Sequence, residues 1–98
     1  MIQTIETELA PKAVGPYSQA AAAGGFVYLS GQIALDPKTG DVVGGDIESQ
    51  ASRVLSNVRA IVEASGAKLT DVVKTTVFLT DLADFQKFNA LYQSFFGS

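Results

Sequence analysis

The sequence contains no cysteine and no histidine among its 98 residues. The absence of cysteine excludes disulfides and thiol nucleophiles, and the two absences together exclude the usual zinc sites. Without histidine the chain also lacks imidazole acid–base chemistry and cannot form a Ser-His-Asp triad. A chain without cysteine is typical of a reducing compartment, so we expect a cytoplasmic protein that binds no metal.

Positive charge is also scarce, because seven lysines and arginines stand against ten aspartates and glutamates, for a net charge of −3. Nucleic acids are bound chiefly through their phosphates, so the absence of a basic stripe argues against a nucleic-acid partner. The N-terminal stretch MIQTIETELAP lacks the basic start and apolar block of a signal peptide. No apolar run reaches membrane-spanning length, and we expect a soluble chain without a membrane partner.

Two adjacent glycines separate the first clear pair of apolar runs. Gly24 and Gly25 tolerate the positive φ angles of a tight hairpin, which predicts strands at about 17–23 and 26–31. We expect residues 32–35 to form a bent continuation of the second strand. The stretch DPKTGD that follows is typical of a turn, since its proline fixes φ and its glycine accepts a left-handed conformation.

The first segment with apolar residues at helical spacing covers about 47–65. It follows Asp46, a typical N-cap residue, and ends before Gly66, which supplies a left-handed stop. Its polar residues lie away from the apolar stripe, and we expect them on the solvated face. They include Arg53, Asn57 and Arg59.

A second helix is predicted at about 82–96, after Asp81 as its N-cap. Between the helices, residues 72–80 are dense in β-branched and aromatic types, which predicts a strand. The order strand, strand, helix, strand, helix indicates an α+β fold with two helices packed on one face of a mixed β-sheet. Three strands are few, since sheets usually have about four to six, and we expect the sheet to be incomplete in this chain.

Three polar positions are candidates for a binding site. Tyr17 follows Pro16, and its phenol either lines a pocket or covers the edge of the core. Ser30 and Gly31 interrupt an apolar run, so the glycine marks either a bulge or a backbone N–H that an anionic ligand can approach. Asn89 flanks the apolar stripe of the second helix, where it is either exposed or a neutral donor into a cleft between subunits.

Three stretches together resemble the Rid family, also called YjgF-like or imine deaminase proteins. They are APKAVGPYSQA, LSGQIALDPKTGDVV, and the long segment from QASRVLSNV to LYQSFF. The resemblance covers nearly the whole chain as one domain, residues 1–98. It implies a fold like that of the bacterial trimeric chorismate mutase, and a homotrimer with ligand clefts at its subunit interfaces.

The resemblance also implies an activity, the hydrolysis of 2-iminobutanoate or 2-iminopropanoate to the 2-oxo acid and ammonia without a cofactor. It implies that Tyr17 acts as a catalytic residue in the cleft. Ser30, Gly31 and Asn89 would then bind the substrate. The alternatives are a non-enzymatic trimeric module for small carboxylates or partner proteins, an inactive fragment, and ribonuclease or translation inhibition, against which the acidic balance argues.

Members of the resembled family continue past the second helix with two strands. These strands carry an arginine that grips the substrate carboxylate and a glutamate that positions water. The present sequence ends at Ser98, before both, and neither Arg53 nor Arg59 matches that motif. We therefore expect a domain truncated at its C-terminus, with another chain or a rearranged strand filling the gap.

Overall fold

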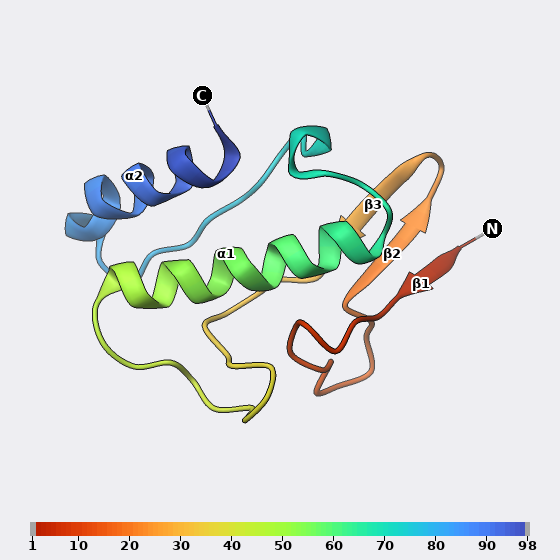
Figure 1. Ribbon diagram of the computed structural model, residues 1–98, viewed down its shortest axis with the longest axis horizontal. Helices are drawn as coiled ribbons and strands as arrows, with labels where there is room; N and C mark the ends of the chain where they lie inside the picture. The colour runs from red at the N-terminus through yellow and green to blue at the C-terminus, as the bar shows by residue number, and fades with distance from the viewer. Residues whose placement is uncertain (1, 98) are drawn as a thin grey trace.

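The computed structural model describes residues 2–97, which form a three-stranded antiparallel sheet and two helices (Figure 1). The strands lie in chain order: β1 (Gln3–Ile5), β2 (Ala20–Ala23) and β3 (Phe26–Leu29). Strands β2 and β3 form the predicted hairpin, and the two turn glycines have φ angles of 60° and 83°. Strand β1 was not predicted, because three residues are too few to show the alternation of a strand. It is identified in the structure by its pairing with β2.

Both predicted helices are confirmed. Helix α1 (Ile47–Ala64) begins after Asp46, whose carboxylate accepts a hydrogen bond from the Ser49 backbone N–H at 2.8 Å. It ends before Gly66, which has a φ of 87°. The second helix starts as the short 3-10 turn η2 (Leu82–Asp84) and continues as α2 (Phe85–Phe96). A further 3-10 turn, η1 (Leu69–Asp71), follows the end of α1.

The core lies between the sheet and helix α1. Ile61 of α1 is fully buried and clusters with Ile5, Ala10 and Ala20. Helix α2 packs alongside α1, with Phe88 as its buried residue (Figure 1). The α+β class is therefore as predicted. No helix among the described residues is long and apolar enough to cross a membrane.

The strand expected at 72–80 is not formed, and the prediction was wrong there. The segment pairs with no strand among residues 2–97, and the side chains of Val73 and Phe78 are 85% and 91% exposed. β-Branched residues favour a pleated surface, but a strand also needs a neighbour to bond its backbone.

Because the expected strand at 72–80 is not formed among residues 2–97, the type of the sheet also differs from the prediction. A strand that returns to a sheet through a helical crossover pairs in parallel, whereas both pairs of the described sheet are antiparallel. The mixed sheet expected from the sequence is accordingly an antiparallel one within the described residues. The continuation at 32–35 is not a strand either, and only Leu35 makes an isolated bridge, to Val42.

The cap of α1 predicts a specific response to acid. The Ser49 backbone N–H, and then the Ser49 hydroxyl, hydrogen-bond to the Asp46 carboxylate and lower its pKa below the ordinary 3.8. The unfolded chain therefore takes up the proton first, so the cap stabilises fully above the ordinary pKa and loses its effect as the pH falls through the lowered one. Asp46→Asn keeps a capping oxygen but cannot titrate.

We expect the two proteins to have similar urea midpoints at neutral pH, and the variant to lose less stability than the parent on acidification through the range below 3.8. Glu8→Gln, which neutralises an exposed carboxylate in a turn outside the helices, is the matched control. Equal acid-induced losses in the parent and in Asp46→Asn would contradict the prediction.

Candidate functional site

A cavity of about 250 Å³ opens where the chain leaves β3. One wall comes from the loop between β1 and β2, and the other from the segment that follows β3. Neither wall belongs to a helix or strand, so its position depends on side-chain contacts. The lining residues include Lys12, Val14, Tyr17, Gln19, Gly31 and Ile33.

Tyr17 lies at this cavity, as one of its two predicted alternatives required. Its backbone N–H donates to the Gly15 carbonyl at 2.8 Å, and its hydroxyl oxygen accepts from the Val14 N–H at a long 3.4 Å. A Cβ atom on Gly15 would lie 3.4 Å from the Tyr17 ring, an ordinary contact distance, so the ring rests close against the loop. About half of the Tyr17 side chain remains exposed, which leaves the phenol available to a ligand.

Gly31 lies at the same cavity and Ser30 beside it. A Cβ atom at position 31 would meet no heavy atom within 4 Å, so the main chain there borders open space. The Ser30 hydroxyl instead donates to the Ser18 carbonyl at 2.5 Å, and its N–H donates to the Gln19 carbonyl at 3.0 Å. Ser30 therefore ties the end of β3 to its neighbour, while Gly31 presents bare backbone to the cavity.

Asn89 is not brought to this cavity. It is exposed on α2, and in the view of Figure 1 helix α2 and the loop after β1 lie on opposite sides of α1. Within one chain, the structure therefore unites Tyr17 and Gly31, sets Ser30 next to them, and leaves Asn89 apart.

Gln19 fixes the loop wall, and the sequence analysis missed it. Its amide nitrogen donates to the carbonyls of Thr7, Ala10 and Pro11 at 3.0, 3.1 and 2.8 Å, and its amide oxygen accepts from the Thr7 N–H at 2.6 Å. The side chain is buried. The sequence does offer one indication of this role: Gln19 comes immediately before an all-alanine strand, which is a poor position for a solvated side chain.

Asn57 fixes the other wall, contrary to the expectation that it lies on the solvated face of α1. It is fully buried, and its amide nitrogen donates to the carbonyls of Ile33 and Leu35 at 3.2 and 3.0 Å. Its amide oxygen accepts from Nε and Nη2 of Arg53 at 3.1 and 2.8 Å. Asn57 is three residues after Val54 and four before Ile61, a helical spacing that could have placed it on the apolar stripe.

The electrostatics of the cavity favour an anionic guest. Lys12 is the cation among the lining residues, and none of them is a carboxylate. Beyond Leu35, the pKa of the Asp36 carboxyl is lowered, chiefly because the Lys38 backbone N–H donates to it. Among residues 2–97 no group of three or more acidic, histidine or cysteine side chains is arranged to hold a metal ion. An ammonium, a phenol and a bare amide can together bind and orient a small carboxylate.

Comparison with known proteins gives a consistent result. The family model described as Endoribonuclease L-PSP matches residues 7–98. A 2-iminobutanoate/2-iminopropanoate deaminase of Salmonella typhimurium is 55% identical over 96 residues, which cover 98% of this chain and 74% of that protein. A RutC family protein of Pyrococcus horikoshii is 54% identical over 97 residues, covering 99% of this chain and 77% of that protein.

Solved structures agree. A Rid family protein of unknown function from Yersinia pestis superposes with a TM-score of 0.97 at 42% identity, covering 100% of this chain and 78% of that one. The backbone of residues 2–97 therefore has the same fold as the corresponding part of this Rid family protein.

The buried amide of Gln19 yields a stability prediction. Gln19→Leu keeps the volume but leaves the three carbonyls and one N–H without their partner, and we expect it to lower the free energy of unfolding by about 2–4 kcal/mol. Urea denaturation measures the change. Gln86→Leu, which places the same apolar side chain at an exposed position of α2, is the control and should change the stability little. Equal effects of the two substitutions would show that the Gln19 bonds contribute nothing.

Proposed function

This chain belongs to the endoribonuclease L-PSP family and, as its sequence predicted, to the Rid proteins, and we propose that it hydrolyses small 2-imino acids to 2-oxo acids and ammonia. The observation that carries the proposal is a cavity that is lined by the uncovered backbone of Gly31 together with Tyr17 and Lys12. The deaminase of Salmonella typhimurium, which is more than half identical, supports 2-iminobutanoate and 2-iminopropanoate as the substrates.

The proposed substrate carries a carboxylate next to the reacting carbon. The Gly31 N–H and the Lys12 ammonium bind this carboxylate, which points the C=N group along the cavity toward Tyr17. The oxygen of a water molecule adds to the imine carbon, and the C–N bond of the resulting carbinolamine breaks. The two protons of the water pass to the departing nitrogen, so that imine and water become ketone and ammonia without any change of redox state.

Little catalytic machinery is needed for this reaction. Imines of this type hydrolyse unaided, so a site that binds the carboxylate and orients the C=N group toward water lowers the barrier by positioning. The absence of a carboxylate among the lining residues is compatible with such a modest catalyst. We propose that the Tyr17 hydroxyl stabilises the hydroxyl group that develops on the attacked carbon.

Asn89 enters the proposal through a second protomer. We propose that the single domain assembles as a homotrimer with the cavity at the subunit interface. The exposed Asn89 of a neighbouring α2 would then complete the cleft and donate to the bound acid. Ser30 supports the site indirectly, because its bond to the Ser18 carbonyl holds the backbone that leads into Gly31.

A coupled assay tests the activity directly. A threonine dehydratase generates 2-iminobutanoate, and the release of 2-oxobutanoate is followed with and without the 98-residue chain. We expect the chain to accelerate release in proportion to its concentration. A rate equal to the uncatalysed one, together with saturable binding of 2-oxobutanoate, would instead identify a non-enzymatic binding module.

Gly31 offers a sharper test of the site. The position has no positive φ, and a methyl group there meets no atom of the chain, so Gly31→Ala should leave the urea midpoint unchanged. The same methyl group would stand between the backbone amide and the carboxylate, and we expect kcat/KM for 2-iminobutanoate to fall about 10- to 100-fold.

Gly44→Ala is the matched control, because Gly44 also has open space around its Cβ position and lies outside the cavity. We expect it to keep both stability and activity. An unchanged kcat/KM in Gly31→Ala would show that the Gly31 amide does not bind the carboxylate, and it would not contradict the proposed activity.

A further inference from the structure

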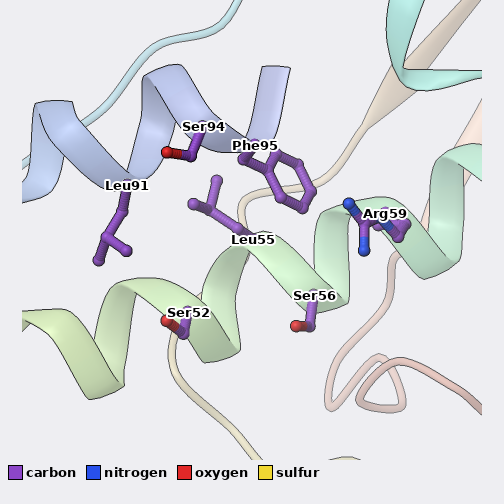
Figure 2. A pocket seen from close by; sticks show the side chains of 7 residues that line it. All are labelled: Ser52, Leu55, Ser56, Arg59, Leu91, Ser94 and Phe95. Atoms are coloured by element: carbon purple, nitrogen blue, oxygen red, sulfur yellow. The ribbon is translucent and has the colours of Figure 1, made fainter. Parts of the chain in front are cut away.

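A second cavity, of about 230 Å³, lies in the groove between α1 and α2 and shares no lining residue with the first. Figure 2 shows its side chains, with Leu55 and Phe95 pointing into the space between the two helices. The volume corresponds to about eight water molecules at ~30 Å³ each, which is room for a small organic molecule. The residues that line it are Ser52, Leu55, Ser56, Arg59, Leu91, Ser94 and Phe95.

Arg59 supplies the charge of this groove. Its guanidinium carbon lies 4.6 Å from the centroid of the Phe95 ring, so the ring of one helix holds the cation of the other. A guanidinium carries five N–H donors, which can bind a carboxylate. The contact with Phe95 therefore holds a cation with several donors at this groove. In Arg53, by contrast, the side chain donates to Asn57.

The rest of the lining divides into a polar edge and an apolar floor. Ser52 and Ser56 lie on α1 one turn apart, and Ser94 lies on α2 (Figure 2). All three serines are exposed, and each hydroxyl can donate one hydrogen bond. Leu55 is buried beneath them, and with Leu91 it provides the apolar surface of the groove.

We propose that this groove binds a small monocarboxylate with an aryl or short alkyl group. The carboxylate pairs with the Arg59 fork and accepts further bonds from the serine hydroxyls, and its apolar group lies on the leucines beside the Phe95 ring. One guanidinium neutralises one negative charge, which favours a monocarboxylate over a dianion such as a phosphate monoester. The site is independent of the proposed deaminase activity, since the two cavities share no residue.

The probe for the test is 4-fluorobenzoate, with 4-fluorobenzamide as its neutral counterpart of nearly the same shape. We expect the acid to shift the amide ¹H–¹⁵N signals of residues 52–59 and 91–95 in the labelled chain, with half-saturation on the order of 1–10 mM for so small a ligand. We expect the amide to shift them little at the same concentrations. Equal binding of both compounds, or shifts confined to residues 12–33, would overturn the proposal.

Variants of Arg59 complete the test. Arg59→Gln should weaken binding of 4-fluorobenzoate at least about tenfold, and Arg59→Lys, which keeps the charge but loses the fork, should weaken it less. Lys38→Gln removes the same charge from an exposed turn outside both cavities and should bind as the parent does. Circular dichroism verifies that each variant is folded. Unchanged affinity in either folded Arg59 variant would exclude the assigned fork.

Discussion

The buried amide of Asn57 joins helix α1 to the segment that walls the first cavity, and the shape of that cavity depends on this contact. The carbonyls of Ile33 and Leu35 lie beyond the ladder of β3, so the sheet cannot satisfy them. The Asn57 amide donates to both of them, while the Ile33 carbonyl also accepts from the Leu35 N–H at 2.8 Å, so this amide is a side-chain link between α1 and the segment after β3. Arg53 then donates twice to the same amide, which leaves no polar atom of Asn57 without a partner.

Gln19 performs the corresponding task on the opposite wall. Its amide gathers three carbonyls of the loop before β2, a stretch with too many turns to form a ladder of its own. The two walls are therefore held in place by two buried amides rather than by secondary structure. Such a frame keeps the backbone at Gly31 uncovered, which a regular strand paired on both sides would not allow.

The parts of the fold that follow from local rules could be predicted from the sequence. The cap at Asp46, the stop at Gly66 and the glycine pair of the hairpin each depend on a few neighbouring residues, and all three are confirmed. The segment at 72–80 was mispredicted because pairing is a property of two segments, of which the sequence pattern describes only one.

The residues of the candidate site also fall into two groups, those that a local sequence pattern indicates and those that depend on distant partners. Tyr17 and Gly31 stood out because each breaks a local pattern, and the structure sets both at one cavity. Gln19 and Asn57 act through carbonyls distant in the sequence, up to 24 residues away, and their residue types alone indicate no partner. The role proposed for Asn89 would depend on a neighbouring protomer, which no pattern within one chain describes.

The chemistry of the two amides has a consequence for kinetic measurements. A carboxamide has no group that titrates in ordinary buffers, so the two amides that support the cavity keep their hydrogen-bonding character when the pH changes. The chain also has no imidazole to titrate near neutrality. For the proposed hydrolysis, we therefore expect a rate profile recorded around neutral pH to follow the protonation of the imine nitrogen and not a change in the two amides that support the cavity.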